Sequence, residues 1–321
     1  MRYFITGGAG FIGSHFVRML LDENLTQVEK VTVFDNFTYS GNPSNLSEFS
    51  QNPKFHLIKG DICDSPLVKS SLTDHDIVVH FAAESHVDRS IQSSRPFILS
   101  NVLGTQTLLE AARDLHTNTF IHVSTDEVYG SIDDGSWTEE EPLLPNSPYA
   151  ASKAASDLVA LSFHRTYDMD VRVSRCSNNF GTHQYPEKMI PLFVTNLLTD
   201  TKVPLYGDGL NIRDWLHVKD HCRGIMAMIE RGQAGEIYNI GGGTELTNIN
   251  LTRMILDIFK KDEEFIQPVA DRLGHDRRYS VDWNKSHIEL GYSPIYTLAD
   301  TLPKIIDWYR TNESWWRPLK K

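Results

Sequence analysis

The residues of this chain best suited to proton transfer are Tyr149 and Lys153, which stand four positions apart. On a helix, side chains at i and i+4 share one face, so the ammonium group can lie beside the phenol. A free tyrosine titrates near pH ~10 and is a poor base at neutral pH, but a nearby positive charge favours the phenolate. The pair therefore predicts removal of a proton from an alcohol, although ordinary helices also show this spacing by chance.

A second group of reactive side chains is formed by Thr125, Asp126 and Glu127, directly after a predicted strand at 119–124. Two neighbouring carboxyls can divide the work of acid and base if their surroundings differ, and the threonine hydroxyl can bind a sugar hydroxyl. Oxidation of an alcohol needs only the tyrosine, so the two carboxyls favour an elimination. The alternative is an acidic helix start, which the helix dipole also favours.

A glycine-spaced turn opens the chain, with Gly7, Gly10 and Gly13 between a predicted strand at 2–6 and a predicted helix at 11–22. Glycines at this spacing let backbone N–H groups approach a pyrophosphate at a helix N-terminus. Many loops contain three glycines, but few have a strand before them and a helix after. The turn therefore predicts a dinucleotide site.

Asp35 indicates which dinucleotide is bound, since it ends the second predicted strand 22 residues after Gly13. A carboxylate at this place accepts hydrogen bonds from the ribose hydroxyls and repels a 2′-phosphate. No arginine lies beside it, since the residues that follow run from Asn36 to Thr38 without one. This favours NAD over NADP, with an ordinary turn aspartate as the alternative.

The ends of the third and fourth predicted strands complete the expected cofactor site. Asp61 and Ile62 follow the third strand and could contact the adenine, although Asp61 could also be a solvated turn residue. Phe81, Ala82 and Ala83 end the fourth strand. The small alanines would let the backbone approach the cofactor closely.

Strand and helix patterns alternate through the first half of the chain, which predicts a parallel sheet with right-handed crossovers. The expected strands lie at 2–6, 30–35, 55–60, 77–82, 119–124 and 170–175, and the expected helices at 11–22, 66–72, 97–115 and 149–167. We expect the α/β class: a Rossmann-type doubly wound parallel sheet with a smaller, mixed α/β C-terminal domain. Residues 1–177 would bind NAD and 178–321 mainly the substrate, while a segment near 211–243, with a strand at 236–240, returns to the first domain.

Composition excludes several functional classes for this chain of 321 residues. Its 31 basic and 42 acidic residues give a net charge of −11, which argues against nucleic acid or an anionic membrane as a partner. An anionic substrate would need a local cluster of Arg and Lys. No apolar run approaches the length of a membrane span, and the chain enters a strand at once, so we expect neither a membrane segment nor a signal peptide.

The cysteines and histidines give no sign of a metal site. Cys63, Cys176 and Cys222 form no Cys-x-x-Cys motif, and the 13 histidines show no metal-binding spacing. We expect reduced thiols, no bound metal and a cytoplasmic location.

Several motifs together resemble those of a known family. They lie at residues 6–13, 81–90, 124–130, 149–153, 177–181, 186–191 and 271–279. Over essentially its whole length the chain is similar to the extended short-chain dehydrogenase/reductases, most specifically to the dTDP-glucose 4,6-dehydratases. The Thr-Asp-Glu triplet carries this distinction, since related nucleotide-sugar 4-epimerases usually lack the Asp-Glu pair. Phe180 and Thr182 depart from the family's usual Tyr and Pro, which affects only the expected loop geometry.

The resemblance implies a redox-neutral elimination on dTDP-glucose with NAD as a bound cofactor. Tyr149, helped by Lys153 and Thr125, would take the C4 hydroxyl proton while hydride passes from C4 to NAD⁺. Glu127 would remove the C5 proton, and Asp126 would protonate the departing C6 hydroxyl. The hydride would then return to C6, giving dTDP-4-keto-6-deoxy-glucose.

The resemblance also implies the rest of the site and a homodimer packed through the helices at 97–115 and 149–167. Phe11, Ile12 and Asn179 would join the cofactor residues. The substrate would be held by Ser85, Asn178, Lys188, Met189, Pro204, Tyr206, Arg213, Asn248, Arg272, His275 and Tyr279. Arginine can hold phosphate oxygens in a fork. Two alternatives remain open: a dehydratase or 4-epimerase for another nucleotide sugar, and a non-catalytic NAD-binding regulator on the same fold.

Overall fold

The computed structural model describes residues 1–22 and 27–320. Its main sheet consists of β1 (Arg2–Thr6), β2 (Lys30–Asp35), β3 (Phe55–Lys59), β4 (Ile77–His80), β5 (Thr119–Thr125), β6 (Val171–Cys176) and β10 (Ile237–Ile240). The strand order is β10-β6-β5-β4-β1-β2-β3, and every neighbouring pair is parallel. The predicted doubly wound α/β fold is confirmed.

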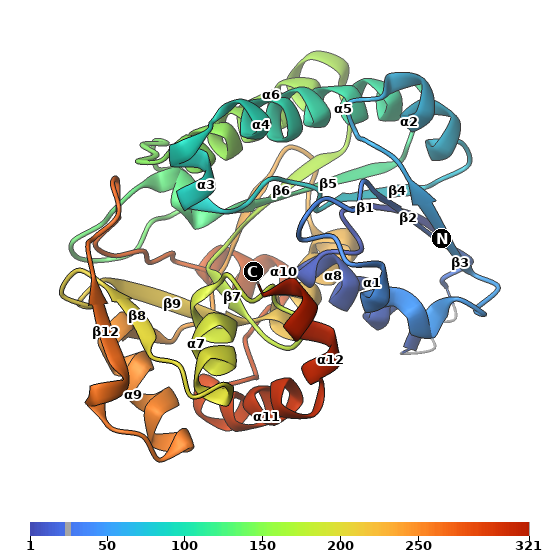
Figure 1. Ribbon diagram of the computed structural model, residues 1–321. Helices are drawn as coiled ribbons and strands as arrows, with labels where there is room; N and C mark the ends of the chain where they lie inside the picture. Colours follow the sequence, from blue (N-terminus) through green and yellow to red (C-terminus); the bar gives the residue numbers. More distant parts are fainter. Residues whose placement is uncertain (23–26, 321) are drawn as a thin grey trace.

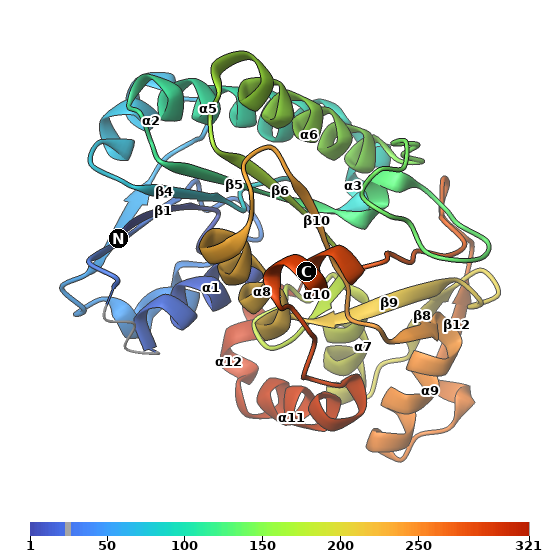
Figure 2. The ribbon, with the colours of Figure 1, turned by 180° about the vertical axis from the view of Figure 1, so that it is seen from behind.

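Helices cover both faces of this sheet (Figure 1). They are α1 (Phe11–Asp22), α2 (Ser65–Leu72), α3 (Val87–Gln92), α4 (Arg95–Phe97), α5 (Thr105–Asp114), α6 (Pro148–Tyr167), α8 (Val218–Arg231) and α10 (Asn284–Leu290). Figures 1 and 2 show α2, α5 and α6 on one face and α1 and α8 on the other. Successive side chains of a strand point to opposite faces, so Tyr3 and Ile5 enter the core beneath α1 and α8. Phe4 enters the core beneath α5 and α6.

A smaller lobe lies below the carboxyl edge of the main sheet in both views. It contains β7 (Asn178–Phe180), β8 (Val203–Tyr206), β9 (Ile212–His217), β11 (Glu245–Thr247), β12 (Ile266–Val269), α7 (Met189–Leu198), α9 (Asn248–Phe259), α11 (Leu298–Thr311) and α12 (Glu313–Trp316). Strands β11, β9 and β7 form one small sheet and β12 and β8 another. The lobe has its own apolar core, which includes Phe193, Leu251 and Ile305.

Short helical turns complete the described elements. These are the 3₁₀ turns η1 (Pro43–Phe49), η3 (Asp126–Tyr129), η4 (Glu263–Phe265) and η5 (Arg317–Leu319), and the π-helical turn η2 (Ile98–Gly104). None of the described helices is both long and apolar enough to span a membrane.

The long helix expected at 97–115 is interrupted, because η2 separates α4 from α5. The wide turn directs Asn101 inward, where its side chain is 1% exposed. This amide accepts a hydrogen bond from the Glu84 backbone N–H and donates to the Glu84 carbonyl and to the hydroxyl of Ser152. Periodicity alone does not reveal such a turn, because its cause is a tertiary contact.

The glycine turn is fixed by close packing against the fourth strand. Gly7 has a φ of +68°, and a Cβ atom there would lie 2.5 Å from the backbone nitrogen of Ala82. Gly135 has a similar φ, +74°, but a Cβ there would meet nothing within 4 Å. Replacing each of these glycines with alanine therefore separates two contributions to the free energy of unfolding: the left-handed backbone, present at both positions, and the backbone collision, present only at Gly7.

We expect Gly135→Ala to lower the free energy of unfolding by about 1 kcal/mol, the cost of a left-handed backbone. Gly7→Ala should cost about 1–3 kcal/mol more, because the methyl group collides with backbone that cannot move aside. Urea unfolding of the two variants and the parent protein measures both values. Equal losses would show that the approach of residues 7 and 82 is not tight.

Candidate active site

A cleft of about 480 Å³ lies at the carboxyl edge of the main sheet. Carboxyl ends of parallel strands meet at one edge, where open α/β sheets bind ligands. Every residue predicted for the dinucleotide or for catalysis lines this cleft: Gly7, Gly10, Phe11, Ile12, Gly13, Asp35, Asn36, Thr38, Asp61, Ile62, Phe81, Ala82, Ala83, Thr125, Asp126, Glu127, Tyr149, Lys153 and Asn179. The fold thus brings together side chains that are as many as 172 positions apart in the sequence.

The glycine turn presents free backbone N–H groups at the start of α1. Its peptides are held by the hydrogen bonds from Gly7 N to Phe34 O, 3.0 Å, and from Gly10 N to Gly7 O, 3.1 Å. A Cβ at Gly13 would lie 2.4 Å from the Gly7 carbonyl oxygen, so the helix can begin this close to the turn only with glycine. A helix N-terminus so exposed fits a pyrophosphate.

Asp35 ends β2 and supports the same turn from beneath. Its Oδ2 accepts the Ala9 N–H at 3.0 Å, and its Oδ1 accepts the Phe37 N–H at 2.8 Å. Burial raises the pKa of Asp35, while these two backbone donors act in the opposite direction. The carboxylate thus both shapes the turn and lines the cleft, and the turn, the carboxylate and the small side chains of Ala82 and Ala83 fit a dinucleotide.

Asp61 lies on the same side of the cleft as Asp35. One of its carboxylate oxygens accepts the Asn36 side-chain amide at 3.1 Å, and the other accepts the Cys63 backbone N–H at 2.9 Å. Both expected adenosine-side carboxylates are therefore ordered by the loops that follow β2 and β3.

Tyr149 and Lys153 lie on the buried face of α6, where they are 9% and 4% exposed. The helix begins with the Ser147 hydroxyl accepting the Ala150 N–H, with Pro148 in the first turn. Lys153 Nζ donates to the Val123 carbonyl of β5 at 2.8 Å. Burial lowers the pKa of Lys153 to about 8.

The phenol of Tyr149 is not made acidic by the protein alone. Burial raises its pKa well above the usual value and the charge of Glu127 raises it further, while the hydroxyl of Thr125 lowers it. The phenol therefore stays protonated unless a further positive charge lies beside it. The expectation that Lys153 and the bound cofactor together favour the phenolate stays a prediction.

Thr125, Asp126 and Glu127 form the turn between β5 and η3. The Thr125 hydroxyl donates to Asp126 Oδ1 at 3.2 Å and accepts the Glu127 N–H at 3.3 Å. Asp126 is 2% exposed, and its Oδ2 has no hydrogen-bond partner among the described residues. Burial and the charge of Glu127 raise the pKa of Asp126 well above its usual range.

Glu127 has a different electrostatic environment. Burial raises its pKa, but the cations of Arg272, Lys188 and Arg213 oppose the shift. The neighbouring carboxyls are therefore unequal: Asp126 is the one that more readily keeps a proton, and Glu127 the one that is more readily ionised. This is the division of labour that an elimination requires.

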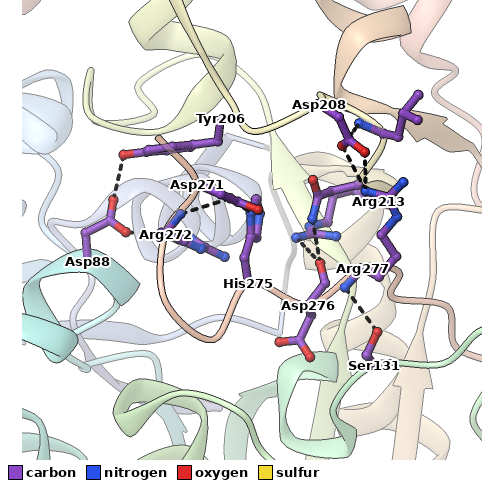
Figure 3. A network of polar contacts seen from close by, with 12 residues as sticks. Asp88, Ser131, Tyr206, Asp208, Arg213, Asp271, Arg272, His275, Asp276 and Arg277 are labelled. Atoms are coloured by element: carbon purple, nitrogen blue, oxygen red, sulfur yellow. Dashed lines mark hydrogen bonds and ion pairs between the residues drawn. The ribbon is translucent and has the colours of Figure 1, made fainter. Parts of the chain in front are cut away.

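Some of the expected substrate residues lie together in the smaller lobe: Tyr206, Arg213, Arg272 and His275 (Figure 3). Arg213 on β9 donates to the Asp276 carbonyl at 2.9 Å and stacks on Tyr279, with its guanidinium carbon 4.3 Å from the ring centre. Arg272 lies 3.9 Å from Asp88 of α3, and its Nε has no hydrogen-bond partner among the described residues. Two guanidinium groups are thus held near Glu127 with donors to spare.

The eleven expected substrate residues divide into two groups. Ser85, Asn178 and Lys188 line the cleft, whereas the remaining eight lie outside its lining: Met189, Pro204, Tyr206, Arg213, Asn248, Arg272, His275 and Tyr279. His275 contacts Asp271 at 2.6 Å and Tyr206 donates to Asp88, while Met189 packs against the core of the smaller lobe.

Some residues that shape the site were missed in the sequence. Asn101 carries no motif, and its role depends on η2. Asp157 stands four positions after Lys153 and pairs with Arg175 at 3.0 Å, entirely buried beneath the cleft; the i,i+4 spacing was visible, but its burial was not. Glu187 lines the cleft and lies in the motif at 186–191, where only Lys188 and Met189 were assigned to the substrate.

Comparisons with known proteins agree with this geometry. A family model described as GDP-mannose 4,6 dehydratase matches residues 4–305. A dTDP-glucose 4,6-dehydratase of Actinoplanes sp. is 56% identical to the chain, covering 98% of this chain and 100% of that protein. The crystal structure of DesIV, a dTDP-glucose 4,6-dehydratase from Streptomyces venezuelae with NAD and TYD bound, is 56% identical over 100% of both chains, with a TM-score of 0.98. A UDP-glucuronic acid 4-epimerase from Bacillus cereus, in complex with UDP-glucuronic acid and NAD, has the same fold at 28% identity, with a TM-score of 0.91 over 97% of this chain and 99% of that one.

Asp35→Ser should narrow the preference for NAD over NADP. Loss of a hydrogen bond to a charged group, about 1.5 kcal/mol, predicts a change of about tenfold in the ratio of the two affinities. Loosening of the turn would weaken the binding of both dinucleotides to the same extent, so the ratio of the two affinities isolates the ribose contact. Calorimetric titration of the apo-protein with each dinucleotide measures it.

Asp64→Ser provides the control for this measurement. Asp64 lies near the same edge of the sheet, but it caps α2 and is not part of the cleft lining. Its replacement should leave the ratio unchanged. An Asp35 variant that behaves like the control would make Asp35 a turn residue only.

Proposed function

The chain belongs to the dTDP-glucose 4,6-dehydratase family of extended short-chain dehydrogenase/reductases, and we propose that it performs this family's reaction with the residues gathered in the cleft. It is a hydro-lyase that converts dTDP-glucose to dTDP-4-keto-6-deoxy-glucose, with NAD as a bound cofactor. The observation that carries the assignment of residues is the unequal carboxyl pair, Asp126 and Glu127, in one buried site with Tyr149.

The first step of the proposed mechanism is removal of the C4 hydroxyl proton by Tyr149. When bound, NAD⁺ places a positive ring in the cleft, takes a hydride from C4 and later returns it to C6. Lys153, held by the Val123 carbonyl, supplies a second cation on the same face of α6. The Thr125 hydroxyl, which lowers the pKa of the phenol, holds the hydroxyl being oxidised.

The second step divides acid and base between the two carboxyls. The 4-ketone acidifies the C5 hydrogen, and Glu127 removes it as the ionised member of the pair. Asp126, whose pKa is well above its usual range, donates its proton to the C6 hydroxyl, which leaves as water. After the hydride reaches C6, Glu127 returns a proton to C5.

The substrate's diphosphate would be held by cations from the smaller lobe. The rise in the pKa of Glu127 is opposed by three cations, those of Arg272, Lys188 and Arg213. They therefore lie close enough to neutralise an anion beside the sugar. Arg272 in particular has an Nε donor without a partner among the described residues. The other residues expected to bind the substrate are part of the same proposal: Ser85, Asn178, Met189, Pro204, Tyr206, Asn248, His275 and Tyr279.

We also propose the division of the chain into an NAD-binding part, 1–177, and a mainly substrate-binding part, 178–321. Separate apolar cores support it. The segment near 211–243 belongs to both parts, since β9 pairs within the smaller lobe while β10 pairs with β6.

A homodimer packed through η2, α5 and α6 is the proposed assembly. Ile98, Leu103 and Leu158 lie on these helices and are 49%, 42% and 56% exposed, which is unusual for leucine and isoleucine on one helical surface. Light scattering that returned the monomer mass, 36.5 kDa, would contradict it. A cytoplasmic location is likewise a proposal, supported by the three free thiols.

Glu127→Gln should stop the reaction after oxidation at C4. Loss of a general base costs about 10²- to 10⁴-fold in turnover, so 4-keto-glucose nucleotide should accumulate on the protein while 6-deoxy product nearly disappears. Single-turnover rapid quench with product analysis measures both species. Unchanged turnover would exclude Glu127 as the base.

Asp126→Asn is the matched comparison. It removes the acid but leaves the base, so C5 hydrogen should still exchange with solvent while water is not lost from C6. Mass spectrometry of substrate recovered from deuterated water detects this exchange. The two variants therefore separate the roles of adjacent carboxyls.

Transfer of a label from C4 to C6 tests the function itself. Substrate deuterated at C4 should give product deuterated at C6, with one solvent hydrogen at C5, and mixed labelled and unlabelled substrates should give no crossed products. A 4-epimerase would keep the label at C4, and a simple dehydrogenase would release it in free NADH. Either result would refute the dehydratase assignment.

A further inference from the structure

Four side chains connect three distant segments beside the cleft. We call this group the clasp: Tyr39, Arg89, Tyr185 and Glu187. Tyr39 lies in the loop after β2 and Arg89 on α3, while the other two lie between β7 and α7. None of them belongs to the catalytic constellation described above.

The clasp residues contact one another in series, from Tyr185 through Tyr39 and Arg89 to Glu187. The guanidinium carbon of Arg89 lies 3.8 Å from the ring centre of Tyr39, which is cation–π geometry. The rings of Tyr39 and Tyr185 meet edge to face, with centroids 5.5 Å apart and an interplanar angle of 89°, a preferred arrangement for aromatic pairs. Arg89 also pairs with Glu187 at 3.2 Å.

The clasp bridges opposite sides of the cleft. On one side, Thr38, Ser40 and Gly41 line the cleft around Tyr39. On the other side, Tyr185 and Glu187 line it themselves. These segments follow β2 and β7, and in the main sheet β1, β4 and β5 separate β2 from β6, the strand before β7. Contacts between them therefore link two loops that line the same cleft as the glycine turn and the catalytic residues.

One side of the clasp is firmly anchored. The Tyr185 hydroxyl donates to the Leu319 carbonyl at 3.1 Å, and the Tyr309 hydroxyl donates to the Gln184 carbonyl at 2.7 Å. The C-terminal helices thus hold this loop. On the opposite side, the loop of Tyr39 is tied to Asp35 through the Phe37 N–H, so the ribose-side carboxylate and the clasp share one short segment.

We propose that the clasp is a retention gate that keeps the dinucleotide in the cleft and must open for its exchange. This inference rests on the proposed function, because a cofactor that is reduced and reoxidised within one cycle must not escape between the two steps. The four residues do not touch the reacting atoms; they act by joining the segments on each side. They are positioning residues.

The test is the rate at which bound NAD exchanges from the holoenzyme. Protein loaded with adenine-labelled NAD⁺ is mixed with excess unlabelled NAD⁺, and the retained label is followed by rapid gel filtration. Tyr39→Leu should exchange about tenfold faster than the parent, because the variant loses both ring contacts; this corresponds to about 1.4 kcal/mol. Arg89→Gln should also be faster, with its melting temperature unchanged, because Arg89 is half exposed.

Conservative and distant substitutions provide the controls. Tyr39→Phe keeps the ring and should exchange at the parent rate. Arg95→Gln removes an exposed arginine on α4 outside the clasp and should have no effect. In the Tyr39→Leu, Arg89→Gln double variant, the increase in exchange rate should be smaller than the two single increases combined, because both changes break the same contact.

Equal exchange rates in Arg89→Gln, Arg95→Gln and the parent would overturn the proposal, and this comparison does not depend on the Tyr39 variants folding. The outcome is separate from that of the proposed function. A protein that exchanges NAD slowly through the clasp but forms no 4-keto product would refute the dehydratase assignment and leave the gate in place. If the label passes within one sugar from C4 to C6 but NAD exchange is unaffected by the clasp variants, the gate is refuted and the dehydratase assignment stands.

Discussion

Burial of titratable side chains at one edge of a parallel sheet is the constraint on which this site depends. Removing a charged form from water is costly, so burial is the largest influence on the pKa of Asp126, Glu127, Tyr149 and Lys153. It moves the acids and the phenol upward and the lysine downward. The two carboxyls thereby acquire different pKa values, according to the charges that lie near each of them.

The cations of the smaller lobe make that difference specific. They oppose the shift at Glu127 more than at Asp126, for which burial and a neighbouring carboxylate act in the same direction. Both lobes therefore influence the carboxyl pair: the main sheet places the two carboxyls, and cations of the smaller lobe favour the ionised form of Glu127. In the proposed mechanism, a substrate diphosphate that binds these cations would also change the pKa of Glu127, which would couple substrate binding to proton transfer.

Backbone that supports the site is held by side chains that take no part in the chemistry. Asn101 fixes residue 84 and Ser152 from within a π-helical turn, and Asp35 fixes the peptides of the glycine turn. The C-terminal helices hold the loop of Tyr185. Precise placement of reacting groups requires such support, because small displacements are costly in rate.

Local sequence patterns were sufficient to predict the fold class and most of the cleft. Alternating strands and helices require a parallel sheet, and a parallel sheet places Gly7, Asp35, Ala82 and Thr125 at one edge, so motifs at strand ends could be assigned to a shared site. Helical spacing likewise placed Tyr149 above Lys153. These inferences are local: each depends on periodicity or on one turn.

Features that depend on contacts between distant segments became visible only in the folded chain. The expected helix at 97–115 contains a π-turn because Asn101 must reach residue 84. The phenol of Tyr149 has a raised pKa because of its burial and the charge of Glu127, and no motif encodes that burial. The clasp joins residues 39, 89 and 185, whose types and spacing suggest nothing in isolation. In each case the physical reason is the same: burial and long-range contact depend on how the chain packs, and a local pattern does not specify that.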